Sequence, residues 1–194
     1  MNPKRLKRLK RSFFIRSTLV VAKDLLGKYL VRKVGNKKLI GKIVETEAYI
    51  GPKDRASHAY GGKVTPRNKT EYLIGGHIYI YLCYGMYWQF NVTTEKAGKP
   101  ECVLIRALEP LNAKAKSKKV ASGPGKLCQW LKLNKSFDRE DLVKSKRIWL
   151  EASGEGIKKS QLVAAKRIGI EYAGSWKNKP WRFYISDNPF ISRK

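Results

Sequence analysis

Apolar and polar side chains alternate along several short segments of the chain, as they do in β-strands whose two faces meet different surroundings. In residues 77–84, isoleucine and leucine alternate with tyrosine and cysteine. Gly85 predicts a turn, and residues 87–92 predict the returning strand of a hairpin. Tyr84 is therefore expected at the tip of the hairpin, where a side chain is hard to bury.

Other segments predict the remaining strands and a long loop. Residues 28–34 and 39–49 are expected to pair across a turn at Gly35 and Asn36. Further short strands are expected over residues 102–108, 148–152, 167–171 and 182–185. The polar residues 51–70 predict a loop, and loops of this length are often functional.

Two short helices are expected. Thr18 is a candidate N-cap for a helix over residues 19–26, which Gly27 ends. Ser122 is a candidate N-cap for a second helix, with Pro124 in its first turn. Many strands with few, scattered helices favour the α+β class. We expect a single compact domain with a mostly antiparallel, curved β-sheet, short flanking helices and a protruding β-hairpin.

The chain ends differ from the predicted domain in composition. Residues 17–194 are assigned to the domain, and residues 1–16, with a basic run at 4–11, to a basic N-terminal arm. The arm either contacts phosphates or is a tail without a role. No apolar run is long enough for a transmembrane helix, so no membrane partner is expected.

The charge balance points to a polyanionic partner. The chain has 42 Lys+Arg against 15 Asp+Glu, a formal net charge of +27. The alternative is a merely basic protein from a lysine-rich proteome. The three cysteines form no close pair and the chain has 2 histidines, so neither a disulfide framework nor a metal site is expected.

Two acids interrupt this basic chain on an apolar strand. Glu45 and Glu47 are two residues apart, so they share one strand face with Tyr49. A carboxylate repels phosphate, so an acid kept beside a polyanion suggests chemistry on the nucleic acid. The alternative is that each glutamate pairs with a lysine at the strand edge.

Tyrosines and other aromatic residues cluster between residues 72 and 90. Each base stacked on an aromatic ring contributes roughly 1–3 kcal/mol, so basic residues interleaved with tyrosines favour nucleic-acid binding. The alternative is an aromatic sheet core. Tyr84 at a hairpin tip could instead wedge between base steps.

Several motifs together resemble one family, the alkyladenine (methylpurine or 3-methyladenine) DNA glycosylases. They are residues 43–52, 54–58, 65–68, 79–87, 91, 104–110, 122–128 and 182–184. The resemblance runs from about Thr18 to Ile191. It implies hydrolysis of the N-glycosidic bond without metal or cofactor, with Glu47 as general base and Arg106 positioning the water. No lysine stands at a nucleophile position, so no lyase step is implied.

The resemblance also implies roles for other positions. Tyr84 would intercalate, while Tyr49, His58 and Tyr81 would sandwich the flipped base. The base pocket would further contain Ala56, whose backbone reads the base edge, Asn91, which crowds the guanine 2-amino group, and Leu104 on its floor. The DNA-backbone candidates are Lys63, Thr65, Arg67, Gly85, Met86, Ser122 and Lys126. For the charged ones, an ordinary solvated position is the alternative.

The leading hypothesis is a monofunctional glycosylase for alkylated purines, with 3-methyladenine as substrate and hypoxanthine and ethenoadenine as further candidates. Its partner would be duplex DNA with damaged purines. The protein would be a monomer of bacterial type, located in the cytoplasm at the nucleoid. Glu71, Tyr72, Trp88 and Gln89 depart from the family's usual residues, so the resemblance does not define the substrate range. The alternatives are a non-catalytic RNA- or ribosome-binding protein and a degenerate, lesion-binding glycosylase.

Overall fold

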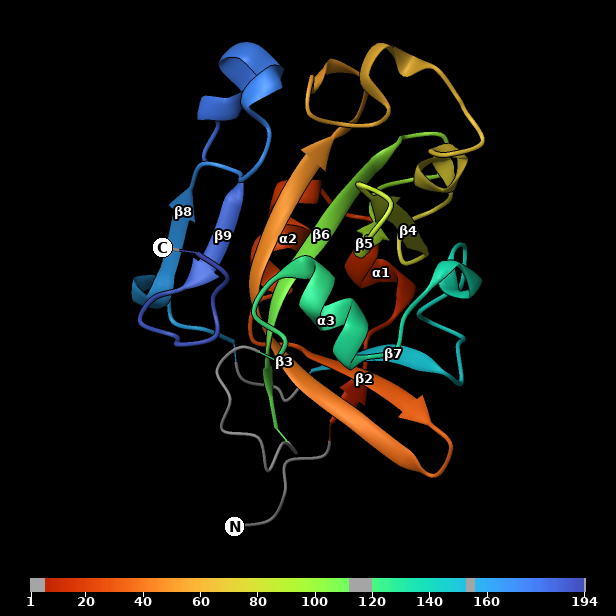
Figure 1. Ribbon diagram of the computed structural model, residues 1–194, viewed down its shortest axis with the longest axis vertical. Helices are drawn as coiled ribbons and strands as arrows, with labels where there is room; N and C mark the ends of the chain where they lie inside the picture. The colour runs from red at the N-terminus through yellow and green to blue at the C-terminus, as the bar shows by residue number, and fades with distance from the viewer. Residues whose placement is uncertain (1–5, 112–119, 153–155, 194) are drawn as a thin grey trace.

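The computed structural model describes residues 6–111, 120–152 and 156–193, shown as coloured ribbon in Figure 1. Within these ranges one sheet of nine strands has the order β1-β7-β2-β3-β6-β5-β4, with β9 beside β3 and β8 beside β9. All of its pairs are antiparallel. The strands are β1 Lys7–Arg8, β2 Tyr29–Val34, β3 Lys37–Ile50, β4 Ile78–Cys83, β5 Tyr87–Thr93, β6 Glu101–Pro110, β7 Ile148–Ala152, β8 Leu162–Ala165 and β9 Arg182–Ile185. The expected α+β class is confirmed.

Short helices flank the sheet. They are α1 Arg11–Phe14, α2 Thr18–Asp24 and α3 Pro124–Trp130. Separate 3₁₀ turns lie at Gly51–Lys53, Tyr60–Gly62, Lys69–Tyr72, Lys135–Phe137, Lys159–Gln161 and Glu171–Asn178. In the view of Figure 1, α1 and α2 lie behind the sheet and α3 lies in front of β5 and β6. Across the described residues, no helix combines the length and apolar character needed to cross a membrane.

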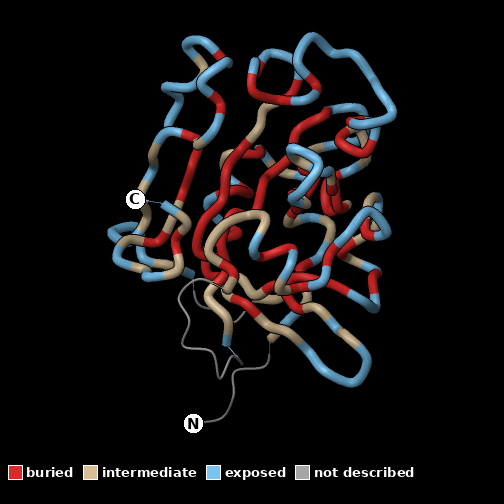
Figure 2. Tube along the Cα trace, viewed as in Figure 1, coloured by how far each residue is buried: buried red, intermediate tan, exposed pale blue. Residues whose placement is uncertain are grey.

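Alternation along the central strands separates the core from a second sheet face. The core takes every second side chain: Val44 and Ala48 from β3, Ile78 and Ile80 from β4, Phe90 and Val92 from β5, and Val103, Ile105 and Ala107 from β6. These buried runs form the red centre of Figure 2. The side chains between them point to the opposite face, where the polar and aromatic residues described below gather.

Strand β3 changes its neighbours along its length. Its first half pairs with β2, Gly41–Ile50 pairs with β6, and Glu45–Glu47 pairs with β9 on the other side. The β3–β6 register shifts between Ile43 and Thr46, which marks a bulge. Bulges bend a strand and increase its twist, and here the bulge lies where β3 leaves β2 and meets β9. The two buried acids of β3 lie at this junction.

Some sequence expectations need correction. The strand expected over residues 167–171 is wrong, because Arg167 lies in a loop and Glu171 begins a 3₁₀ helix; its apolar alternation mimics a strand. Ser17, not Thr18, is the N-cap of α2, since the Thr18 hydroxyl is bonded to Thr94 and Glu101. Strands β1 and β8 were not predicted.

Two further boundaries differ from expectation. Gly123, with φ of 128°, is the N-cap of α3, and the Ser122 hydroxyl donates to the Ile191 carbonyl instead. The boundary between arm and domain, expected at residue 16, also lies earlier in the chain. Lys7–Arg8 pairs with β7, and Leu9 and Phe14 are buried in the core, so residues 6–16 pack as part of the domain.

Candidate active site

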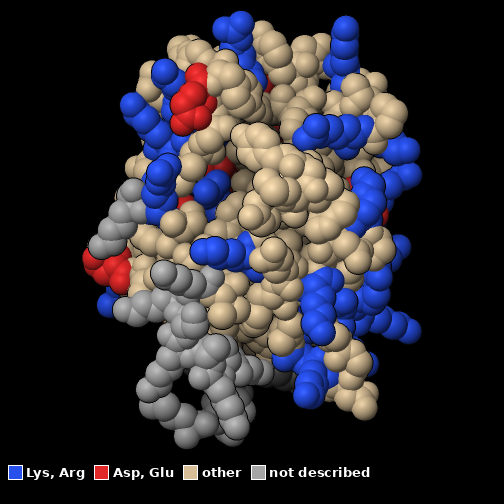
Figure 3. Space-filling model, in the orientation of Figure 1, with Lys and Arg blue, Asp and Glu red and all other residues tan. Residues whose placement is uncertain are grey.

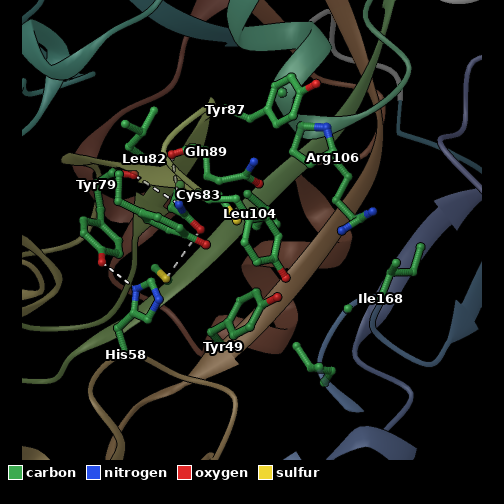
Figure 4. Close-up of a pocket in the computed structure, with 18 of the residues that line it drawn as sticks. Tyr49, His58, Tyr79, Leu82, Cys83, Tyr87, Gln89, Leu104, Arg106 and Ile168 are labelled. Atoms are coloured by element: carbon green, nitrogen blue, oxygen red, sulfur yellow. Dashed lines mark hydrogen bonds between the residues drawn. The ribbon is translucent and has the colours of Figure 1, made fainter. Parts of the chain in front are cut away.

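A cavity of about 810 Å³ lies on the polar and aromatic face of the sheet. Its walls come from β3 to β6, the β4–β5 hairpin, the loop after β3, residues 122–126 and residues 168–172. The predicted site residues that line it are Tyr49, Ala56, His58, Arg67, Tyr81, Tyr84, Gly85, Asn91, Leu104, Arg106, Ser122 and Lys126. In Figure 4, His58 and Tyr79 lie on one side of the cavity and Arg106 and Ile168 on the other.

Glu47 lies directly behind the cavity wall that contains Tyr49, Arg106 and Ile168. Its side chain is 0% exposed and does not itself line the cavity. One oxygen, Oε1, accepts from the Ile168 amide at 2.9 Å and pairs with Arg106 Nη1 at 3.2 Å. The other oxygen, Oε2, accepts from the Tyr49 hydroxyl at 2.8 Å. All three of these partners line the cavity, so the carboxylate is separated from it by one layer of side chains.

Glu45 has a different environment although it shares a strand face with Glu47. Arg106 Nε and Arg182 Nη1 donate to its Oε1 at 3.2 and 3.0 Å. The Ser192 amide donates to its Oε2 at 2.6 Å. Two guanidinium groups and a backbone amide therefore fix Glu45, as expected for a structural acid that holds Arg106 in place.

The protonation states around Glu47 follow from burial and charge. Burial lowers the pKa of Arg106, but Glu47 and Glu45 more than offset this, so its pKa lies above the usual value and the guanidinium stays charged. Burial, then the charge of Glu47, raises the pKa of Tyr49 well above its usual value. Tyr49 therefore keeps its proton and donates it in the hydrogen bond to Glu47.

An arginine holds Tyr49 from behind. Arg167 makes a fully buried, bidentate salt bridge with Asp54, at 2.5 and 2.8 Å, and also donates to the Ala48 carbonyl. Its guanidinium carbon lies 4.8 Å from the centre of the Tyr49 ring. Planar guanidinium groups stack well on aromatic faces, so Arg167 and Asp54 fix the orientation of this wall.

The opposite wall is aromatic. The His58 and Tyr81 rings meet edge to face at 4.5 Å, and the His58 Nδ1 lies 2.7 Å from the Tyr79 hydroxyl. Burial, followed by the charge of Arg67, lowers the pKa of His58 to about 4, while burial raises the pKa of Tyr79. His58 is therefore neutral at pH 7, and its Nδ1 shares a hydrogen bond with the Tyr79 hydroxyl.

The cavity mouth is formed by the hairpin. Tyr84 is 85% exposed and has φ of 50°, and the following Gly85 has φ of 68°. This left-handed turn, which glycine adopts without strain, projects the tyrosine away from the sheet. Tyr172, 71% exposed, lies on the rim as a second aromatic side chain.

The remaining candidates lie outside the cavity lining. Lys63 and Thr65 are exposed in the loop, where Thr65 and the Lys63 carbonyl bond to Asn68 and so shape the turn. Met86 is exposed beside Tyr84 at the hairpin tip. Cys83 is half-buried at the cavity, whereas Cys102 and Cys128 are buried thiols.

Sequence reasoning did not single out several lining residues. Tyr79 lies two positions before Tyr81, and this spacing alone could have placed both on one wall. Glu71 had only its departure from the family pattern as a signal. Ile168 contributes a backbone amide, and Tyr172 lies in a segment without a motif, so neither had a sequence signal.

Basic side chains surround the site. Figure 3 shows Lys and Arg spread over this face of the molecule, with few acidic side chains among them. Arg67 and Lys126 line the cavity itself. In the portion of the chain that the structure describes, no group of three or more His, Cys, Asp or Glu could hold a metal ion.

Comparisons with known proteins agree on one family. The model of the methylpurine-DNA glycosylase family matches residues 12–189. The chain is 45% identical over 196 residues (95% of this chain, 98% of the relative) to a Natranaerobius thermophilus protein named "Putative 3-methyladenine DNA glycosylase". A Clostridium tetani protein with the same name is 47% identical over 204 residues (96% and 100%). The human "DNA-3-methyladenine glycosylase" is 41% identical over 206 residues, 96% of this chain and 68% of the relative.

Proposed function

Since the chain belongs to the methylpurine-DNA glycosylase family and is thus a DNA N-glycosylase, we propose that it releases alkylated purines, 3-methyladenine among them, with a water molecule activated by Glu47. The observation that carries the proposal is a buried glutamate fixed by Arg106 behind the cavity wall that Tyr49 and Arg106 line. A non-catalytic RNA-binding protein would not need this arrangement. Hypoxanthine and ethenoadenine are further candidate substrates.

Two unlike oxygens define how Glu47 would act. Oε1 is fixed by the Ile168 amide and Arg106, whereas Oε2 contacts only the Tyr49 hydroxyl among the described residues. A water molecule that takes the place of this hydroxyl would lie between Glu47 and the cavity.

The reaction then follows from this position. The N-glycosidic bond breaks and its electron pair leaves with the purine, which a ring alkyl group makes a better leaving group. The water oxygen bonds to the anomeric carbon of the sugar, and Oε2 takes the water proton. The negative charge of the glutamate also stabilises the positive charge that develops on the sugar.

The cavity walls suggest how the base is held. A flipped purine fits between Tyr49 on one side and His58 with Tyr81 on the other, with Ala56 at its edge, and Asn91 and Leu104 below. Tyr84, exposed at the mouth, would fill the gap in the duplex. The proposed DNA-backbone contacts are Lys63, Thr65, Arg67, Gly85, Met86, Ser122 and Lys126.

The test replaces Glu47 by glutamine, which keeps the shape and removes the base. Release of methylated purines from alkylated duplex DNA in EDTA should fall by about 10² to 10⁴-fold, while binding to lesion DNA persists. The matched control is Glu171→Gln, the same change at an exposed carboxylate outside the cavity lining. It should leave release unchanged. Unchanged release in Glu47→Gln would refute the catalytic assignment.

The partner in this proposal is duplex DNA with damaged purines, bound by a monomer at the nucleoid. Each phosphate neutralised on binding contributes a slope of about −0.9 to log K against log salt. Binding to undamaged duplex, titrated between low and high salt, should show this steep dependence. A flat response would contradict the proposed phosphate contacts.

A further inference from the structure

Glu71 is a buried acid in the same cavity to which the mechanism gives no role. It lies in the 3₁₀ turn Lys69–Tyr72, is 1% exposed, and lines the cavity. Its Oε1 accepts from the Cys102 thiol at 3.3 Å. Its Oε2 is buried without any hydrogen-bond partner among the described residues.

The turn that carries Glu71 is firmly anchored. Asn68, just before it, bonds to the Thr65 amide and to the carbonyls of His58 and Lys63. Thr70, next to Glu71, donates to Asp138. A buried polar atom left without a partner costs free energy, so a rigid turn that holds one at a cavity wall indicates that a ligand supplies the partner.

We propose that Glu71 is a specificity-determining residue, which selects purines that carry a positive charge over neutral purines by presenting a carboxyl group at the buried wall of the base cavity. An alkyl group on N3 or N7 of a purine nucleotide gives the base a positive charge, which normal bases lack. The inference rests on the proposed function, because the base must occupy this cavity.

The charge state of Glu71 can respond to such a ligand. Burial raises the pKa of Glu71 to about 8, although the Cys102 hydrogen bond and the charge of Arg67 lower it. The other titratable groups around it are Tyr79 on β4, Cys102 on β6 and Tyr72 on its own turn, and burial raises the pKa of each, so they stay neutral. The acid is therefore mostly protonated at pH 7, and it can release its proton to solvent when a cationic base arrives.

The test measures binding in a Glu47→Gln background, in which the proposed chemistry is off. Duplexes with one 7-methylguanine, which is cationic, and with one hypoxanthine, which is neutral, are compared by fluorescence anisotropy. Adding Glu71→Gln should weaken binding to the cationic lesion by about tenfold or more, with less than about a threefold change for the neutral one. Calorimetry in two buffers should show proton release at pH 7 only with Glu71 present.

Equal weakening for both duplexes, or no change for either, would overturn the proposal. Glu71→Met, which has similar length and no charge, should behave as Glu71→Gln does if charge is the cause. Circular dichroism of each variant separates these results from misfolding. Failure of the proposed function looks different: Glu47→Gln would then release base like the wild type, or neither duplex would bind better than undamaged DNA.

Discussion

Two buried glutamates lie at different parts of the same cavity, and their polar partners differ. Glu47 has the cation of Arg106, a backbone amide and a hydroxyl around it, whereas Glu71 has a thiol and an oxygen without a partner. Arg106 and Cys102 are four residues apart on β6, so roughly 13 Å separates the two regions. Burial is equal in both, so the partners, not the depth, decide what each acid can do.

The largest effect is expected from removing the cation of the Glu47 region. Arg106→Met leaves Glu47 buried without a compensating charge, which should lower the free energy of unfolding by about 3–5 kcal/mol. Urea unfolding measures this. Arg67→Met is the matched change near Glu71, where the arginine is exposed, and should change stability by at most about 0.5 kcal/mol. Equal losses would erase the distinction between the two regions.

The next effect concerns the pH dependence of stability at Glu71. The folded state keeps the Glu71 proton up to about pH 8, while the unfolded chain loses it near the ordinary value of 4.5. Between these limits the folded state binds more protons, so wild-type stability should fall as pH rises, by at most about 1.4 kcal/mol per pH unit. Glu71→Gln should lack this loss in urea titrations. Parallel curves for the two proteins would contradict the buried acid.

His58, on the aromatic wall, should show the opposite sign. Its pKa is lowered from 6.5 to about 4 by burial. Between these pH values the imidazole is protonated in the unfolded chain and neutral in the folded protein. Stability should therefore fall as pH drops from 6.5 to 4, over a narrower range than for Glu71. His58→Gln should flatten this acid limb alone, and thermal unfolding at several pH values would reveal whether it does.

Replacing Tyr84 should change the free energy of unfolding least, because this side chain contacts neither glutamate and is 85% exposed. Tyr84→Ala should stay within about 0.5 kcal/mol of the wild type in unfolding. Its effect should appear in DNA binding, as a loss of preference for lesion over undamaged duplex. If nonspecific binding falls by the same factor, the wedge role is refuted.

The sequence predicted what depends on local alternation. The two faces of β4, the pairing of β2 with β3 and the hairpin that ends at Tyr84 follow from spacing of two and from glycine. The common face of Glu45, Glu47 and Tyr49 follows in the same way, since Glu45 and Glu47 contact Arg106 and Tyr49 bonds to Glu47.

What the sequence did not predict depends on distant contacts. Arg167 was assigned to a strand, because the apolar alternation after it resembles one, yet its buried partner is Asp54. Glu71 lies in a segment that resembles a polar loop, and only its packing against β4, β5 and β6 buries it. The sequence also could not show that Glu47 lies behind the cavity wall rather than lining the cavity. This depends on the positions of Ile168 and Tyr49 in the folded protein.

The contacts of β3 also bear on when the protein acquires its activity during synthesis. The bond from Ile168 to Glu47 spans 121 residues, and the bond from Ser192 to Glu45 spans 147. Closing loops of this size costs chain entropy that local contacts do not repay, and such topologies fold slowly. A nascent chain can form its first hairpins on the ribosome, but Glu47 gains the Ile168 amide only after residue 168 has emerged, and Glu45 gains the Ser192 amide only after residue 192 has emerged.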